Sequence, residues 1–195
     1  MMPAARESLL DAAFAALVRR PWAAVRMVDV AAAAGVSRQT LYNEFGSKDG
    51  LARALLRREA DGYLAGVDRA LAAEHDARGK LTATAEWTTT LARENALVRA
   101  MLTGCWNERL PAPATAAVAS SSAVPAQRRA DRPLPSPADF VVIVRDRAVA
   151  ALAGHESADL ARSCELAVRL ALSCVAAPPG EGGVADLVRG ALDTV

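Results

Sequence analysis

Residues 26–51 read RMVDVAAAAGVSRQTLYNEFGSKDGL, and this stretch specifies its local structure more tightly than any other part of the chain. Its first apolar residues recur at helical spacing, which predicts a short helix with one buried face. Gly35 follows where a helix passes into a turn, because glycine adopts positive φ at little cost. Ser37 is placed to accept a hydrogen bond from the first free amides of a second helix. The stretch therefore predicts two short helices joined by a tight turn.

The second of these helices is predicted to have two unlike faces. Leu41 and Phe45 lie four residues apart and point inward. Gln39 and Asn43 lie on the opposite side, and a third helix begins with Lys48 in its first turn. Two short helices joined at a glycine, the second polar on its free face, describe a helix-turn-helix.

Residues 34–51, AGVSRQTLYNEFGSKDGL, closely resemble the DNA-binding signature of the TetR/AcrR transcriptional regulators. The Leu-Tyr pair, the Phe and the Ser-Lys pair carry the resemblance, and the position near the N-terminus and the total length agree with it. The match covers roughly the first 50–60 residues. The family usually has Thr just before the first motif helix; this chain has Arg26 and Met27, and Arg26 is expected to reach a phosphate.

The helical patterns extend over most of the chain and predict an all-α protein. A leading helix completes a three-helix head, a long helix connects the head to the remainder, and the C-terminal part is helical. We expect a helix-turn-helix DNA-binding domain over 1–47 and a helical ligand-binding and dimerisation domain over 48–195. The Pro-rich residues 111–137 are expected to form a loop with a short helix at 114–122. The other helices are expected at 5–20, 48–73, 81–107 (one bent helix or two short ones), 136–154, 157–177 and 183–194.

The composition limits the class of protein. Hydrophobic residues make up 52% of the 195 residues, and the few aromatics favour helices over sheets. No apolar run approaches the roughly 18 residues that a membrane span needs, and we expect a cytoplasmic protein with no secretory signal. The net charge is +1, and residues 1–75 contain ten Lys and Arg against nine Asp and Glu. Such a balance argues against a strong non-specific polyanion binder.

Enzymatic interpretations find little support in the sequence. It has no phosphate-binding glycine loop, no metal-ligand cluster and no nucleophile with a base at a known spacing. We expect neither a catalytic residue nor a metal nor a cofactor. The histidines, His75 and His155, are expected in exposed turns, and the three cysteines are expected to be small buried hydrophobes.

The resemblance implies that the helix of residues 38–44 enters the major groove of DNA. We expect Gln39 and Asn43 to contact base edges, because each amide presents a donor and an acceptor together. Arg38 is expected to read a guanine or to hold a phosphate. Phosphate contacts, which fix register without reading sequence, are expected from Ser37, Thr40, Tyr42, Lys48 and Arg26. Simple capping and solvation remain the alternative for the two hydroxyl residues, and ring packing for the tyrosine.

The middle of the chain is unusually apolar, and two interpretations of it stay open. It forms either a packed core or a ligand cavity lined by aromatic and Met side chains. The resemblance favours the cavity, which would take a small hydrophobic ligand, lipid-like or aromatic. Its expected lining is Trp87, Leu91, Met101, Leu102, Cys105, Trp106, Phe140 and Val144.

The helix expected at 157–177 is apolar nearly all round, and must be covered on several sides. A second subunit is its natural cover, and the resemblance implies a four-helix bundle made by this helix and the one before it from both subunits. The expected interface residues are Val141, Ala148, Leu152, Leu166, Leu170 and Cys174.

The sequence therefore indicates a ligand-responsive transcriptional repressor that binds a palindromic double-stranded DNA operator as a homodimer and is released by its ligand. A transcriptional activator is one alternative. A helical small-molecule-binding or interaction protein with a non-functional helix-turn-helix is the other.

Overall fold

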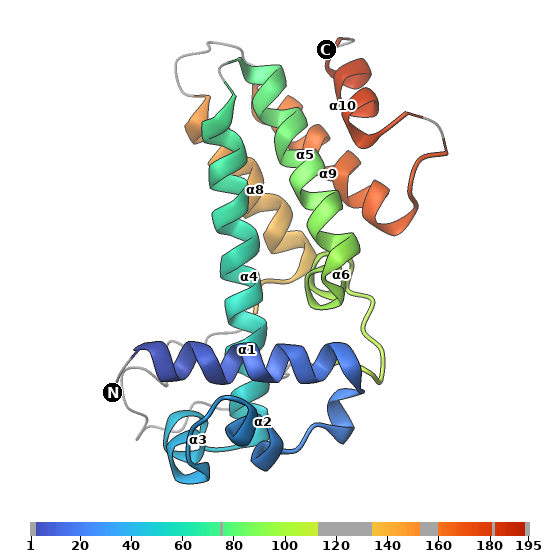
Figure 1. The fold of residues 1–195 in the computed structure, drawn as a ribbon. Coiled ribbons are helices and arrows are strands. Elements are labelled where there is room, and N and C mark those ends of the chain that lie inside the picture. The colour runs from blue at the N-terminus through green and yellow to red at the C-terminus, as the bar shows by residue number, and fades with distance from the viewer. Residues whose placement is uncertain (1–2, 75, 113–133, 153–159, 181, 194–195) are drawn as a thin grey trace. The chain divides into compact units, whose positions relative to one another are not determined.

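The computed structural model describes residues 3–74, 76–112, 134–152, 160–180 and 182–193 (Figure 1). Every regular element in these ranges is a helix, which confirms the all-α prediction. The short helix expected at 114–122, both histidines and the first residues of the helix expected at 157–177 lie outside the described residues. No helix in the described ranges is long and apolar enough to cross a membrane.

The chain separates into two units by its internal contacts. The head unit contains, among the described residues, 3–59, 106–112 and 134. The helical unit contains the described residues of 60–105 and 135–193. The division therefore falls within one long helix, α4 (Lys48–Ala73), whose bounds agree with the predicted 48–73. The boundary of 47/48 between functional domains stays a prediction.

Four further elements build the head unit around a shared apolar core (Figure 1). They are α1 (Pro3–Arg19), the 3-10 turn η1 (Trp22–Ala24), α2 (Met27–Ala33) and α3 (Arg38–Phe45). Apolar side chains at helical spacing meet in this core, as the sequence pattern predicts. Its largest buried members are Leu9, Leu10, Leu41, Leu51, Leu55 and Leu56.

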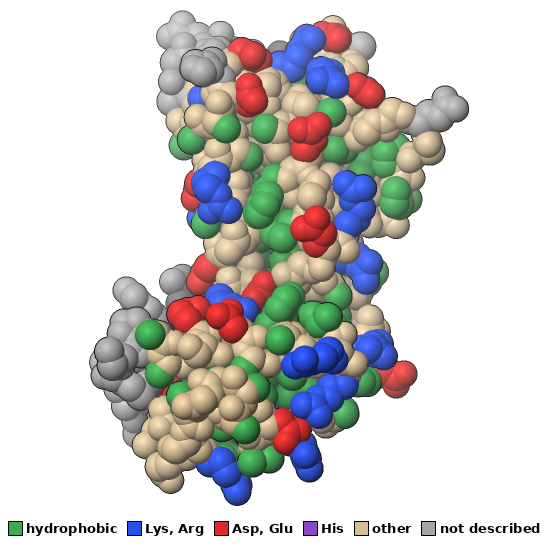
Figure 2. Space-filling view, viewed as in Figure 1, with side chains coloured by type: hydrophobic (Ala, Val, Ile, Leu, Met, Phe, Trp, Pro, Cys, Tyr) green, Lys and Arg blue, Asp and Glu red, His purple; other side chains and the backbone are tan. Residues whose placement is uncertain are grey.

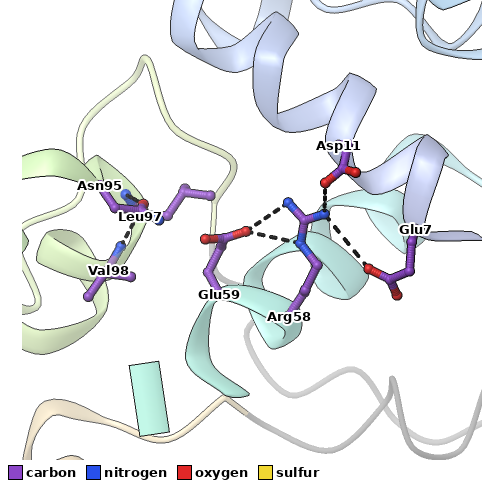
Figure 3. A network of polar contacts seen from close by, with 7 residues as sticks. All are labelled: Glu7, Asp11, Arg58, Glu59, Asn95, Leu97 and Val98. Atoms are coloured by element: carbon purple, nitrogen blue, oxygen red, sulfur yellow. Dashed lines mark hydrogen bonds and ion pairs between the residues drawn. The ribbon is translucent and has the colours of Figure 1, made fainter. Parts of the chain in front are cut away.

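An ion cluster joins α1 to the first half of α4 (Figure 3). Arg58 Nη1 lies 2.6 Å from Asp11 Oδ1 and 3.9 Å from Glu7 Oε2, and its Nη2 lies 2.9 Å from Glu59 Oε1. The two acidic residues of α1 thus serve as partners of Arg58, and neither lies in the first turn of their helix. The partly exposed pairs contribute modestly to stability and join α1 to the first half of α4.

A segment from the middle of the chain also belongs to the head unit. The Trp22 amide donates to the Arg109 carbonyl oxygen over 2.8 Å, and Pro111 is buried. Asn107 shapes this segment, because its Oδ1 accepts from the Arg109 amide over 3.0 Å and its carbonyl accepts from the Leu110 amide. The chain therefore returns to the head after the helices of residues 77–103.

The helical unit contains the second half of α4 and five further helices. The pattern over 81–107 is resolved as two helices separated at Asn95, whose side chain accepts from the Leu97 and Val98 amides (Figure 3). Ser136 begins α8 with a capping box that includes Asp139, at the start of the helix expected at 136–154. The five helices are α5 (Ala77–Glu94), α6 (Ala96–Thr103), α8 (Pro137–Ala151), α9 (Leu160–Ala176) and α10 (Val184–Leu192).

Small and polar side chains line the interior between α5 and α9. Thr84 and Thr88 are buried, and their hydroxyls donate to carbonyls one turn earlier in α5. Thr88 also shares a hydrogen bond of 3.1 Å with the Tyr63 hydroxyl, and burial raises the pKa of Tyr63 to about 12. The phenol ring meets Phe140 edge-on at 5.7 Å. Tyr63 is therefore a neutral hydrogen-bonding anchor between α4, α5 and α8.

Gly66 makes room for Trp87, the half-buried tryptophan of α5. A Cβ on Gly66 would lie 2.0 Å from the indole ring. The indole nitrogen donates to the Tyr63 carbonyl over 3.0 Å, and the Arg69 guanidinium stacks 5.6 Å from the ring centre. Gly66, which weakens an isolated helix, is thus required here for the contact of α4 with α5.

Gly66→Ala should lower the free energy of unfolding by about 1–3 kcal/mol, because the new methyl group displaces the indole. Gly62→Ala is the matched control in the same helix, since a Cβ at Gly62 meets nothing within 4 Å. It should raise stability by up to about 1 kcal/mol through helix propensity. Urea denaturation checks both, and equal effects of the two substitutions would contradict the proposed packing role of Gly66.

Candidate nucleic-acid interface

The turn between α2 and α3 has the geometry that the sequence predicts. Gly35 has a φ of 68°, in the left-handed region that favours glycine. Ser37 caps α3, and its Oγ accepts from the Thr40 amide over 3.0 Å. The two hydroxyls are also hydrogen-bonded to each other at 2.8 Å. Capping by Ser37 is therefore confirmed, and the Ser37 side chain remains exposed at the start of α3.

The inward face of α3 is held by apolar and ionic contacts together. Leu41 is fully buried, and Phe45 is buried at the last turn. Arg6 of α1 reaches across to this helix, pairing with Glu44 and stacking 4.9 Å from the centre of the Phe45 ring. This link was not predicted, because Arg6 and Glu44 lie 38 residues apart and Arg6 lies outside the motif. Because one face is fixed in this way, α3 has little freedom to rotate about its own axis.

The outward face of α3 is polar and exposed. Gln39 and Asn43 lie one turn apart, and the Gln39 amide nitrogen donates to the Asn43 side-chain oxygen over 2.7 Å. Arg38 is exposed beside them, and 40% of Tyr42 is exposed. Each amide keeps further donor and acceptor capacity, so this face can hydrogen-bond to base edges.

Arg26 precedes α2 but makes no side-chain cap to that helix. Its guanidinium instead forms two hydrogen bonds with Asp29, of 3.1 Å and 3.0 Å, while Arg20 lies 3.2 Å from the same carboxylate. The bond from Arg26 holds the pKa of Asp29 below its ordinary value. Asp29 is thus a positioning residue that was not predicted from the sequence, although its place three residues after Arg26 is a usable signal.

Lys48 is held by the turn before α2. Its ammonium donates to the Ala23 carbonyl over 3.0 Å and lies 5.5 Å from the centre of the Trp22 ring. Partial burial lowers the pKa of Lys48. One donor of the ammonium is used, and two remain for a phosphate. Lys48 therefore joins η1 to the start of α4 in addition to its predicted role.

Figure 2 shows acidic and basic side chains interspersed over the upper part of the face in view, in keeping with the near-neutral net charge. Several basic side chains gather at the lower right of that face, with a few acidic ones among them. Affinity for DNA would then depend on a few well-placed contacts.

The sequence of the helices from α1 to the start of α4 matches a known protein family. Residues 9–55 match the N-terminal model described as "Bacterial regulatory proteins, tetR family". Residues 9–55 thus resemble the N-terminal domain of the tetR family, and this match does not extend over the rest of the chain. The matched residues include the complete helix-turn-helix and the start of α4.

Two relatives match the chain over part of its length. One is the HTH-type transcriptional regulator AlkX of Mycobacterium tuberculosis, 50% identical over 66 residues, which are 34% of this chain and 31% of AlkX. The other is the HTH-type transcriptional activator FasR of Mycolicibacterium smegmatis, 41% identical over 81 residues, which are 42% of this chain and 37% of FasR. The matches span less than two fifths of either relative. Both proteins are named as regulators rather than as enzymes.

The fold extends this likeness over nearly the whole chain. The crystal structure of the TetR family repressor AlkX from Dietzia sp. matches with a TM-score of 0.53 and 20% identity, covering 97% of this chain and 92% of that one. At this identity the match shows a similar fold and does not show what the helical unit binds.

The structure does not place the eight residues of the predicted ligand pocket in one common environment. Met101, Leu102, Phe140 and Val144 are buried in the helical unit, and Trp87 and Leu91 are half-buried there. Cys105 is exposed, contrary to the expectation that all three cysteines are buried, because it follows the end of α6 at Gly104. Trp106 belongs to the head unit. The pocket itself stays a prediction.

The predicted dimer residues also differ from one another. Val141, Ala148, Leu152 and Cys174 are already buried within a single chain, whereas Leu166 and Leu170 are half-buried. The apolar residues of α9 thus belong to two faces. One face packs on α5 and α8, and the other holds apolar side chains that remain partly exposed in the single chain. Val142, 44% exposed on α8, is a further candidate that was not predicted from the sequence.

Substitutions at Ser37 separate its capping role from a phosphate contact. Ser37→Ala should lower the stability of the protein by about 1 kcal/mol, because the Thr40 amide loses its acceptor. Ser37→Asp keeps a good cap and should leave the melting temperature nearly unchanged. If Ser37 faces a phosphate, the new carboxylate should nevertheless weaken DNA binding at least about tenfold by like-charge repulsion. Unchanged DNA affinity of Ser37→Asp in a fluorescence-anisotropy titration would remove Ser37 from the interface.

Proposed function

We propose that the protein is a ligand-responsive transcriptional regulator, most simply a repressor, that binds a palindromic operator as a homodimer. The observation that carries the proposal is α3: a Ser37-capped helix fixed on its inward face by Leu41 and Phe45 and polar on its exposed face. A helix presented in this way fits the major groove of B-DNA. The tetR-family match of the same residues supports it.

Sequence would be read by Gln39 and Asn43, whose mutual hydrogen bond holds both amides on the exposed face. A bidentate amide–adenine contact is the natural use of such a side chain. Arg38 would read a guanine or hold a phosphate. The remaining contacts, from Arg26, Ser37, Thr40, Tyr42 and Lys48, would fix the register on the phosphate backbone.

Dimerisation would use the exposed sides of α8 and α9. These sides adjoin, because Arg145 Nη1 of α8 lies 3.6 Å from Glu165 Oε2 of α9. Val142, Leu166 and Leu170 remain partly or largely exposed on the same two helices. Apolar groups beside a short ion-pair row are typical of an interface between identical subunits.

A small hydrophobic inducer would bind in the apolar interior of the helical unit. It would act by binding better to the form of the dimer that DNA binds worse, since a ligand shifts an equilibrium only by its differential affinity. Two segments of the chain connect the helical unit to the head unit. The first is α4, which is ion-paired to α1 through Arg58. The second is the segment that contains Arg109, whose carbonyl accepts a hydrogen bond from the Trp22 amide.

An activator is the second candidate, because FasR, one of the matched relatives, is named as one. Both candidates need the same operator contacts and differ in what the bound dimer does at the promoter. Transcription from a reporter that carries the bound DNA distinguishes them. A helical binding protein with a non-functional helix-turn-helix would instead fail to retain DNA at low salt.

Removing the side-chain amide of Gln39 or Asn43 should weaken binding to the operator and leave binding to random DNA unchanged. Gln39→Ala or Asn43→Ala should weaken operator binding by about 1–3 kcal/mol and relax base preference at one position in each half-site. The measurement is competition between operator and random DNA at fixed salt. Equal losses on both DNAs for Asn43→Ala would exclude it from base readout.

Lys48→Ala is the contrasting variant. It should weaken binding to operator and random DNA alike and flatten the dependence of affinity on salt, because a phosphate contact is lost. The bond to the Ala23 carbonyl is lost as well, so its melting temperature must be compared with that of the wild type. A change confined to the operator would contradict the phosphate role.

Leu166→Glu or Leu170→Glu should convert dimers into monomers at micromolar concentration, since a charge would be buried without a partner. Val18→Glu is the matched control, because Val18 is 68% exposed on α1 of the head unit. Sedimentation velocity measures the oligomeric state of the wild type and of each variant. A wild-type protein that sediments as a stable monomer would overturn both the dimer and the palindromic operator.

A further inference from the structure

A cleft of about 460 Å³ lies in the helical unit among α5, the C-terminal end of α9 and the start of α10. It shares none of the residues predicted for the hydrophobic inducer. Its volume is within the range of small-molecule sites. The described residues that line it are Glu86, Thr89, Thr90, Arg93, Cys174, Pro178, Pro179, Gly182, Gly183 and Val184.

The wall formed by α5 is polar along its whole length. Its residues occupy positions i, i+3, i+4 and i+7 of one helix face, so they form a single row. Glu86 and Arg93 are exposed at the two ends of the row, and seven residues of α-helix separate them by about 10 Å. Between them the Thr89 hydroxyl donates to the Ala85 and Glu86 carbonyls, so its oxygen keeps acceptor capacity only.

The described residues that line the facing wall are apolar or glycine. Pro178 and Pro179 follow α9, and Val184 begins α10. Two glycines between them contribute no side chain. Among the described lining residues, the α5 wall therefore supplies an anionic group at one end and a cationic group at the other, and the facing wall supplies apolar groups.

We propose that this cleft binds a small zwitterion, with a carboxylate at Arg93 and an ammonium at Glu86. A guanidinium binds a carboxylate through two parallel hydrogen bonds, and Arg93 uses only its Nε, in a long 3.4 Å contact to the Thr89 carbonyl. The aliphatic or ring portion of the ligand lies against Pro178, Pro179 and Val184. An extended chain of about eight carbons spans the required 10 Å.

The test is calorimetric titration of the full-length protein with 8-aminooctanoate, octanoate and octylamine, in the absence of DNA. The zwitterion should bind at least about tenfold more tightly than either singly charged analogue, because each charged hydrogen bond adds affinity. Glu86→Gln should reduce its affinity to that of octanoate, and Arg93→Gln to that of octylamine. Glu94→Gln and Arg99→Gln, which remove exposed charges outside the cleft, should bind as the wild type does.

The double substitution Glu86→Arg with Arg93→Glu tests whether the lower affinity of the single variants comes from misfolding rather than from the lost charge. It exchanges the two ends of the cleft, so the zwitterion should bind again in the reverse direction. Thr90→Trp, which fills the cleft from its exposed wall, should abolish binding. Equal affinity for the three ligands, wild-type binding by both single variants, or no binding at millimolar concentration would each overturn the proposal. Because DNA is absent, a failure of the regulator proposal would leave this result unaffected.

Discussion

The burial of Leu41 and Phe45 is the constraint on which the head unit depends. These two side chains fix one face of α3 in the apolar core, so the other face must be exposed. Arg6 adds a second restraint through Glu44 and the ring of Phe45. A short helix of eight residues would be marginal alone, and here its orientation comes from packing and from the Ser37 cap. The chemistry of the exposed face then follows from the sequence alone, with Gln39 and Asn43 held together.

The turn before α3, its cap and its buried face could be predicted from the sequence, because each depends on residues close together in the chain. Gly35, Ser37 and the four-residue spacing of the apolar pair act within one or two turns, and each has the predicted geometry. The same holds for the start of α8 at Ser136 and for the length of α4, which is set by continuous helical periodicity.

The features that sequence reasoning missed depend on partners far apart in the chain. Gly66 reads as a weak point in a helix until Trp87 is placed against it, 21 residues later. The cleft on α5 forms only when residues after α9 fold back onto that helix. The pairing of Arg58 with Glu7 and Asp11 likewise joins segments more than 45 residues apart. Cys105 is exposed because α6 ends just before it, which the apolar pattern of 81–107 did not show.

The central claim is that α3 of each subunit lies in a major groove of one palindromic site. Hydroxyl-radical footprinting of the full-length protein on the DNA flanking its own coding region, at low salt, tests it most directly. The account predicts two protected half-sites related by a twofold axis, with their centres separated by about one helical turn or a multiple of it. Protection of a single half-site, or no protection at low salt, would contradict it.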